Sequence, residues 1–318
     1  MIQFLIYTLL VLSLSFSAHA AENSDNSADG VDDPVKTQKP ATTTPVPPAR
    51  PIVAAPKSNE YYFNSDADRF FKADEIKPLL AGDQDFYVLF RDDMTGRPKG
   101  VALLIPDWGQ TATSSRGLDF LRTVLPDYGW VTLSMTVPQS RDQVFDTKQA
   151  TEPATAQTEF KVAKPPLPVR TIDEDYMNSY EMQLKMRMLA LTDEAQNYQG
   201  YFIVIAQGSS AAVLASLYAK EELDEPEAMI LLDASVHDFK LTEKMNQDIT
   251  ANAVPTLDIY QSRNSRWARK NIEMRRKLAR KNFKVSYRSK ELFGDISYHN
   301  QNQRMLKIVY GWLSSLGL

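Results

Sequence analysis

The stretch YFIVIAQGSSAAVLA, residues 201–215, carries most of the information about the fold. Its first residues are apolar and suit a buried strand, and Gly208, Ser209 and Ser210 then interrupt the apolar run. An alanine-rich segment that favours a helix follows at once. A strand that passes through a tight turn of small residues into a helix is typical of a sheet whose strands are connected by helices.

The same segment has the form of a nucleophile elbow, G-x-S-x-G, in which the positions two before and two after the nucleophile must be small. Ser210 meets this requirement, because Gly208 and Ala212 occupy those positions. Ser209 meets it less well, because Gln207 would crowd the turn. In a third register Gly208 itself takes the nucleophile position, which fits the strand length best and leaves no nucleophile. A turn of small residues also occurs wherever a helix packs close to a sheet.

Outward from this stretch, strand-like and helix-like segments alternate along the chain. Strands are predicted at residues 86–91, 101–105, 130–135, 201–205, 228–232, 256–260 and 283–287, and helices at 118–125, 176–191, 211–222, 267–279 and 302–313. Short, nearly continuous apolar strands separated by helices predict an α/β fold with a mainly parallel twisted sheet and helices on both faces. The first two strands flank a turn at residues 95–98, so we expect the sheet to begin with an antiparallel pair.

The bulk composition is that of an ordinary globular protein. The chain has 318 residues, of which 43% are hydrophobic and 24% charged, and its formal net charge of −4 gives no reason to expect a nucleic-acid partner. It contains no cysteine, which excludes disulfides, thiolate metal sites and a cysteine nucleophile.

The first twenty residues predict export. They contain no charged side chain, and their apolar run ends in Ala18-His19-Ala20, a cleavage pattern of signal peptides. The run at residues 2–16 is too short to span a bilayer comfortably, and no later segment is apolar enough to do so. We therefore expect a signal peptide at residues 1–20 and a periplasmic or otherwise exported protein.

One segment precedes the predicted folded domain, and another interrupts it. Residues 21–58 contain no aromatic residue and are rich in Pro, Ala, Thr and Ser, which predicts a disordered linker. The domain itself is expected at residues 59–318. A proline-rich, polar stretch at about 137–170 lacks periodicity, and it predicts an insertion that is either a lid or an unstructured excursion.

Candidate partners for a catalytic serine come from later in the chain. A serine hydrolase needs a histidine base, and His299 lies between the last predicted strand and the last helix, where such a base would fall. His237 suits this role less well. Asp233 ends a buried strand and would point toward the same sheet edge as the elbow. Asp258 lies within a strand, where a structural role is the alternative to that of the catalytic acid.

A candidate oxyanion hole follows the second predicted strand. The backbone N–H groups of Trp108 or Gly109 lie where hydrolases of this kind place such donors. Asp107 would oppose a developing oxyanion if its side chain pointed inward. The alternative is a simple strand-to-helix turn covered by Trp108.

A basic segment stands out in this acidic protein. Residues 262–281 contain nine Lys or Arg and a single acid, and Trp267, Met274 and Leu278 lie roughly on one helical face. The opposite face is then strongly cationic, and Arg275 and Arg276 are candidate contacts for an anionic envelope surface or an acidic partner. The alternative is a solvated outer face of a helix that covers the sheet.

Several strings of the sequence resemble one family. They are LLIPDWGQ at residues 103–110, GWVTLSMTVPQ at 129–139, FIVIAQGSSAA at 202–212, PTLDIY at 255–260 and GWLSSLGL at 311–318. They resemble an uncharacterised α/β-hydrolase-like family of exported Gram-negative proteins, over roughly residues 62–318 without the insertion. The resemblance implies an eight-stranded sheet. It also implies that Gly208 stands where hydrolases carry serine, because the family's elbow reads like G-H-G-T-G-A.

Two functions follow as hypotheses. The first is an esterase-like serine hydrolase acting on an envelope acyl ester, with Ser210 as nucleophile, His299 as base and Asp233 as acid. The second is a catalytically degenerate fold that binds a small molecule or another envelope component. Because the sequence lacks dinucleotide-binding, phosphate-loop and metal-ligand motifs, neither a cofactor nor a metal is predicted.

Overall fold

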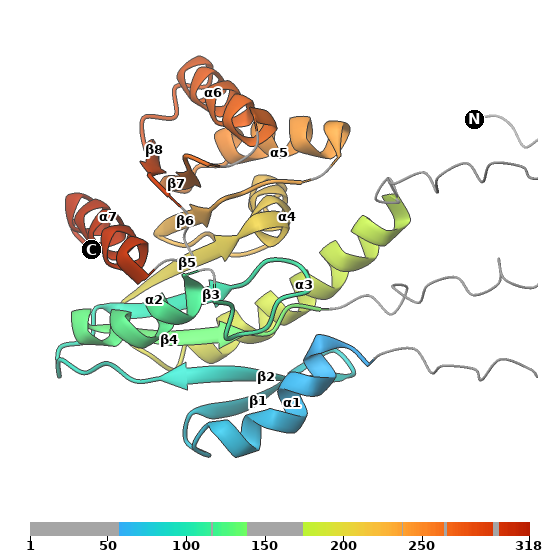
Figure 1. Ribbon diagram of the computed structural model, residues 1–318, viewed down its shortest axis with the longest axis vertical. Helices are drawn as coiled ribbons and strands as arrows, with labels where there is room; N and C mark the ends of the chain where they lie inside the picture. Colours follow the sequence, from blue (N-terminus) through green and yellow to red (C-terminus); the bar gives the residue numbers. More distant parts are fainter. Residues whose placement is uncertain (1–56, 116, 139–173, 237, 264–265, 295–298) are drawn as a thin grey trace, which may run out of the picture. The chain divides into compact units, whose positions relative to one another are not determined.

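The computed structural model describes residues 57–115, 117–138, 174–236, 238–263, 266–294 and 299–318 (Figure 1). The predicted signal peptide, almost all of the predicted linker and nearly all of the predicted insertion lie outside these residues. The first described helix, α1, begins at Asn59, and Ser58 caps it by accepting a hydrogen bond from the Tyr61 N–H group (3.1 Å).

The described residues form strands and helices in alternation after an initial helix and strand pair. The elements are α1 (Asn59–Phe70), β1 (Ile76–Ala81), β2 (Gln84–Arg91), β3 (Gly100–Ile105), α2 (Leu118–Val124), the 3-10 helix η1 (Leu125–Tyr128), β4 (Trp130–Met135), α3 (Glu174–Ala195), β5 (Tyr201–Gln207), α4 (Gly208–Ala219), β6 (Ala228–Leu232), α5 (Phe239–Ala251), β7 (Thr256–Gln261), α6 (Arg266–Lys281), β8 (Tyr287–Leu292) and α7 (His299–Ser315).

The strands form one eight-stranded sheet in the order β1-β2-β4-β3-β5-β6-β7-β8. From β4 to β8 every neighbouring pair is parallel, and β1 and β2 complete the sheet with two antiparallel pairings. The predicted α/β fold is therefore confirmed. The sheet begins with antiparallel strands, as expected, but the first two predicted strands do not pair with each other, because β4 lies between β2 and β3.

The core lies on both faces of the sheet, because successive side chains of a buried strand point in opposite directions. In β5, Val204 and Ala206 pack with residues of α3, α4 and α5, whereas Ile203 and Ile205 pack with residues of α2 and α7. Figure 1 shows these two groups of helices on opposite sides of the sheet. Helix α1 covers a separate, smaller cluster built on Leu89 of β2.

The register of the parallel strands places the candidate site. Ile105 of β3 pairs with Ala206 of β5, so the residues that follow these two strands lie side by side at the carboxyl edge of the sheet. In open α/β sheets, ligand and catalytic sites form at this edge. The loop after β3 and the turn after β5 therefore meet.

Some predicted boundaries differ from the structure. The last strand spans Tyr287–Leu292 and not residues 283–287, and α1, β1 and α5 were not predicted. The other predicted strands and helices are present, with most of their ends shifted by a few residues.

Candidate functional site

The turn between β5 and α4 has a glycine at its strained position. Gln207 ends β5 in an extended conformation, and Gly208 follows with a φ of +56° as the first residue of α4. In a nucleophile elbow the nucleophile occupies this sharp strand-to-helix turn. Of the three registers that the sequence allows, the structure has the one with Gly208 in the nucleophile position.

The space that a side chain would need at this position is filled by Asp107. A Cβ atom built on Gly208 would lie 2.1 Å from the Asp107 Cγ and 2.2 and 2.4 Å from its two carboxylate oxygens. These distances are far below van der Waals contact. A serine or any other L-residue therefore fits at residue 208 only if Asp107 moves.

The Asp107 carboxylate is held by two backbone N–H groups. Its Oδ1 atom accepts hydrogen bonds from the Trp108 N–H (2.8 Å) and the Ser209 N–H (2.7 Å). In α/β-hydrolases the oxyanion hole is made by the N–H of the residue after the nucleophile and by an N–H from the loop that corresponds to β3–α2 here. Ser209 follows the nucleophile position and Trp108 lies in that loop. A carboxylate oxygen of the protein itself therefore occupies the place of a substrate oxyanion.

The local electrostatics favour this arrangement. The first N–H groups of a helix have no partner within the helix, and the helix dipole attracts a negative charge to that end. Asp107 supplies that charge to the N-terminus of α4. The Trp108 N–H, which the sequence offered as an oxyanion donor, binds the Asp107 carboxylate, and the Asp107 side chain points toward Gly208. Gly109 contacts α1 through its carbonyl, which accepts a hydrogen bond from the Asn59 Nδ2 atom (2.9 Å).

Ser210 and Ser209 are bonded to the surrounding backbone. Ser210 is fully buried; its Oγ atom donates to the Pro106 carbonyl (2.5 Å) and is hydrogen-bonded to the Tyr180 hydroxyl (2.7 Å). The Ser209 hydroxyl is half-buried and donates to the Ser235 carbonyl (3.3 Å). Ser210 therefore joins α4 to the β3–α2 loop and to α3. It does not lie where a nucleophile could meet a substrate.

Helix α3 covers the loop that carries Asp107. The Trp108 ring stacks on Tyr176 and Tyr180 of α3, with ring centroids 4.7 and 5.0 Å apart. Burial raises the pKa of the Tyr180 phenol well above its usual value, so this hydroxyl keeps its proton. The stack fixes the loop and with it the Trp108 N–H. This contact has no signal in the sequence, because the insertion separates the two segments.

The other predicted catalytic residues follow strands that end at the same edge. Asp233 directly follows β6 with a φ of +55°, and its N–H donates to the Ile259 carbonyl (2.7 Å). His299 is the first residue of α7, after β8, but its side chain lies outside the described part, as does all of His237. The topology therefore places Asp233 and the start of α7 at the edge that holds Gly208.

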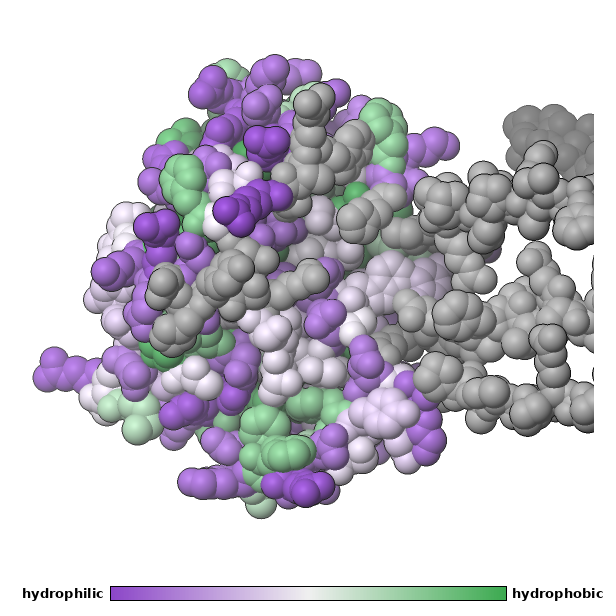
Figure 2. All heavy atoms as spheres, viewed as in Figure 1, coloured by the Kyte–Doolittle hydropathy of each residue, from purple (hydrophilic) through white to green (hydrophobic). Residues whose placement is uncertain are grey.

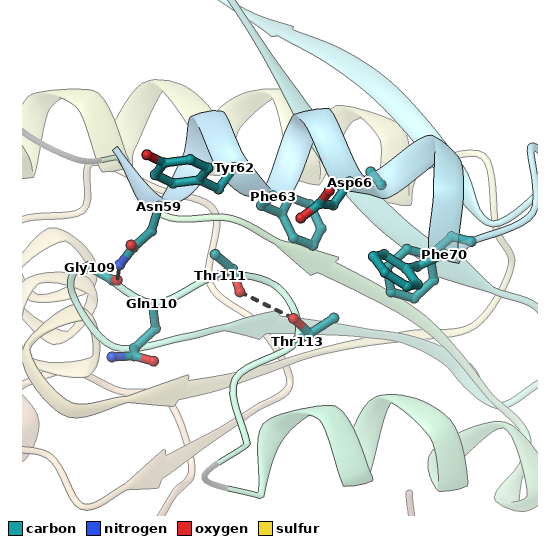
Figure 3. Close-up of a pocket in the computed structure, with 11 residues that line it drawn as sticks. Asn59, Tyr62, Phe63, Asp66, Phe70, Gly109, Gln110, Thr111 and Thr113 are labelled. Carbon is teal, nitrogen blue, oxygen red and sulfur yellow. Dashed lines mark hydrogen bonds between the residues drawn. The ribbon is translucent and has the colours of Figure 1, made fainter. Parts of the chain in front are cut away.

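A groove borders this loop on the side of α1 (Figure 3). It has a volume of about 460 Å³ and lies between α1 and residues 109–113. Tyr62, Phe63 and Phe70 line it from α1, and Gln110 lines it from the loop. Tyr62 and Phe70 are half or more exposed although they are large and apolar. This groove was not predicted from the sequence, because residues 59–70 were not assigned to a helix.

Comparison with known proteins places the chain in a family. Residues 2–315 match the family described as protein of unknown function (DUF3530). The chain belongs to the DUF3530 family. The predicted resemblance to an α/β-hydrolase-like family of unknown function is thus confirmed. A comparison with curated proteins finds no match for this DUF3530 protein.

Solved structures similar to this DUF3530 protein are α/β-hydrolases of low sequence identity. A dienelactone hydrolase from Anabaena variabilis has a TM-score of 0.51 and 12% identity, over 76% of this chain and 96% of its own. The carboxylesterase Cest-2923 from Lactobacillus plantarum has a TM-score of 0.51 and 13% identity, over 76% and 97%. A predicted CIB-like hydrolase from Thermoplasma acidophilum has a TM-score of 0.51 and 10% identity, over 76% and 98%. At these identities the likeness shows the fold alone.

Arg275 and Arg276, the predicted anion contacts of this DUF3530 protein, differ in their burial. Arg275 is only 1% exposed; its Nε atom donates to the Asp258 Oδ2 atom (2.7 Å), so it cannot contact an external anion. This prediction is wrong for Arg275, because a carboxylate within a buried strand needs an internal cation. Arg276 is half-buried, and its Nε atom donates to the Ser289 hydroxyl (2.6 Å). The buried face of α6 contains Arg275, while Met274, expected on the apolar face, is exposed.

No group of three or more His, Cys, Asp or Glu side chains in the described ranges is arranged to hold a metal ion. Among the same residues, no helix has the length and apolar character needed to cross a membrane.

Proposed function

We propose that this DUF3530 protein is an exported, non-catalytic member of the α/β-hydrolase fold that binds an envelope ligand or partner. The observation that carries the proposal is the pairing of Gly208 at the nucleophile position with Asp107 in the oxyanion hole. Export is supported by the apolar residues 1–20 and their Ala18-His19-Ala20 pattern.

Ester hydrolysis in this fold needs a nucleophile at the turn and N–H donors that are open to the developing oxyanion. Gly208 supplies no nucleophile. The Asp107 carboxylate occupies the Trp108 and Ser209 donors, and its negative charge would repel an oxyanion that formed beside it. Removal of a single oxyanion-hole donor lowers kcat by about 10²–10³-fold, and here both donors are already bonded.

The test is covalent labelling of the purified protein with a fluorophosphonate probe, together with hydrolysis of p-nitrophenyl acetate. We expect no labelling at Ser209 or Ser210 and the same background rate in the wild type and in the matched variants Ser209→Ala and Ser210→Ala. The serine-hydrolase hypothesis predicts the reverse. Labelling at Ser210, and turnover that Ser210→Ala and His299→Ala both abolish, would overturn the proposal.

We assign ligand binding to the groove beside α1. The groove offers aromatic rings next to the polar Gln110 and Asp66 side chains, a lining that suits a small ligand with an apolar body and a polar end. The variant Tyr62→Ser/Phe70→Ser removes two exposed rings from it. Tyr61→Ser is a matched control, since Tyr61 is equally exposed on the same helix but does not line the groove.

The probe for this groove is 1-anilinonaphthalene-8-sulfonate, whose fluorescence rises in an apolar site. We expect its binding to weaken more than fivefold in the Tyr62→Ser/Phe70→Ser variant and by less than twofold in Tyr61→Ser. Equal effects of the two variants, with unchanged circular dichroism, would exclude the groove as the binding site.

A further inference from the structure

A cationic and apolar surface lies beside β8, the outer strand on the side of the sheet away from β1. A hollow of about 540 Å³ lies where the chain leaves α6 and enters the edge strand β8. Three arginines and two apolar residues of its lining form what we call the β8 patch, namely Arg276, Arg280, Arg288, Phe283 and Val285. The lining contains no acidic residue. Figure 2 shows the surface over α6, at the top of the view, as mainly hydrophilic.

Phe283 projects from this patch in a conformation that a phenylalanine rarely adopts. Its φ is +54°, and its side chain is 88% exposed. The Phe283 N–H donates to the Arg280 carbonyl (3.2 Å) and the Lys284 N–H to the Ala279 carbonyl (2.9 Å), the two bonds of a Schellman motif. Glycine is the usual residue at this position of the motif, because a side chain there is strained.

The strain at Phe283 is not offset by burial within the chain. Val285, two residues later, is also 78% exposed, so two large apolar side chains stand in solvent. Positive charges alone have a simple structural explanation, because Lys and Arg on an edge strand prevent pairing with other sheets. That explanation covers Arg288 and not the two apolar residues. A partner that covers Phe283 and Val285 accounts for both.

The charge around the two apolar residues identifies the partner. Residues 276–291 contain seven Lys or Arg and the single acid Glu291. Arg280 and Arg288 are exposed, and Arg276 is half-buried. Guanidinium groups bind phosphate through two parallel hydrogen bonds, and aromatic or aliphatic side chains between such cations enter the boundary of the acyl chains.

We propose that the β8 patch docks the protein on an anionic phospholipid surface. The exposed Arg280 and Arg288 contact lipid phosphates, and Phe283 and Val285 enter the interfacial layer. This inference is independent of the non-catalytic role proposed above, because it rests on the other edge of the sheet and on different residues.

The experiment is co-sedimentation of the purified protein with phosphatidylglycerol–phosphatidylcholine vesicles and with pure phosphatidylcholine vesicles. We expect binding to the anionic vesicles only, weakened by salt. Arg280→Glu/Arg288→Glu should lower the affinity more than tenfold. Phe283→Ser/Val285→Ser should lower it several-fold. The matched control Arg269→Glu/Lys270→Glu reverses two exposed charges of α6 outside the hollow and should change it less than threefold.

A second measurement reports insertion directly. The chain has no cysteine, so Phe283→Cys and the control Lys270→Cys each accept one environment-sensitive fluorophore at a single site. We expect a blue shift with anionic vesicles at residue 283 and none at residue 270. The proposal is overturned if the wild type does not bind anionic vesicles, if the control reversal weakens binding equally, or if both labels respond alike. Tighter binding to polyglutamate than to vesicles would also overturn it, in favour of an acidic protein partner.

Discussion

Asp107 and Asp258 both turn a carboxylate into the protein, but different groups hold them. Asp258 lies within β7 and is fully buried; it accepts hydrogen bonds from the Arg275 guanidinium and from the Tyr287 hydroxyl, each at 2.7 Å. Asp107 lies beyond the end of β3 and is held by the N–H groups of Trp108 and Ser209.

The difference separates a carboxylate that holds the fold from one that fills the site. Removal of Asp258 leaves a full positive charge, Arg275, buried without its counter-ion. Removal of Asp107 leaves two amide donors at a helix N-terminus, which water or a small anion can satisfy. Asp107 is thus the residue whose loss would restore the space of an oxyanion hole while the fold remains.

The largest effect is expected for Asp258→Ala. It should lower the free energy of unfolding by about 3–5 kcal/mol, because a buried pair that loses one partner leaves the other charge uncompensated. Urea denaturation followed by circular dichroism measures this loss. The double variant Asp258→Leu/Arg275→Met removes both charges and should recover most of the stability. A loss below about 1 kcal/mol in Asp258→Ala would contradict the assigned role.

A smaller effect is expected for Gly208→Ala. The added Cβ meets the Asp107 carboxylate, and residue 208 has a positive φ that an alanine adopts only with strain. The free energy of unfolding should therefore fall by about 2–3 kcal/mol. In an Asp107→Ala background the same substitution should cost clearly less, because the clash is gone. A double-mutant cycle of the two changes measures their coupling. Strict additivity would show that Asp107 does not occupy the space beside residue 208.

Asp107→Ala alone should cost about 1–2 kcal/mol, the loss of hydrogen bonds to a charged group. It should also create an anion site that the wild type lacks. We expect sodium acetate to raise the melting temperature of Asp107→Ala relative to sodium chloride at equal ionic strength, and to leave the wild type unchanged. The same acetate response in both proteins would argue against a filled oxyanion hole.

The smallest effect is expected for Lys284, whose amine is turned into the protein. Its Nζ atom donates to the uncharged oxygens of Ile249, Asn252 and Thr256 (2.8, 2.6 and 3.0 Å). Burial lowers the pKa of Lys284 from 10.5 to about 7. Between these values the unfolded chain keeps the proton and the folded protein releases it, so stability rises with pH. Relative to Lys284→Met, the wild type should gain about 1 kcal/mol from pH 6 to pH 8 in urea unfolding. Parallel pH profiles would contradict this.

The sequence predicted best the strands that helices cover on both faces. β4 and β6 match their predicted ranges, because every residue is buried and the run is wholly apolar in β6 and mostly apolar in β4. The edge strand β8 alternates between buried and exposed residues, and the prediction fell instead on residues 283–287. Helix α5 was missed because polar residues, Thr242, Asn246 and Thr250, make up much of its buried face beside Met245 and Ile249.

The candidate site was predictable in its parts and not in its arrangement. The sequence offered Gly208 as one of three occupants of the turn, and it placed Trp108 and Asp107 in the loop. The orientation of Asp107 depends on the pairing of Ile105 with Ala206, which brings together residues 102 positions apart. The burial of Arg275 had a signal, since Asp258 within an apolar strand requires an internal cation, but Arg275 was predicted among the outward charges.

The central claim is that the Asp107 carboxylate occupies the oxyanion hole, and amide resonances in a ¹⁵N-labelled sample test it most directly. We expect the Trp108 and Ser209 amide protons to be shifted downfield in the wild type and to move upfield together in Asp107→Ala. The Gln110 amide, which donates to the main-chain carbonyl of Asp107 (2.9 Å), is the internal control and should move little. Trp108 and Ser209 resonances that stay in place when the carboxylate is removed would contradict the account.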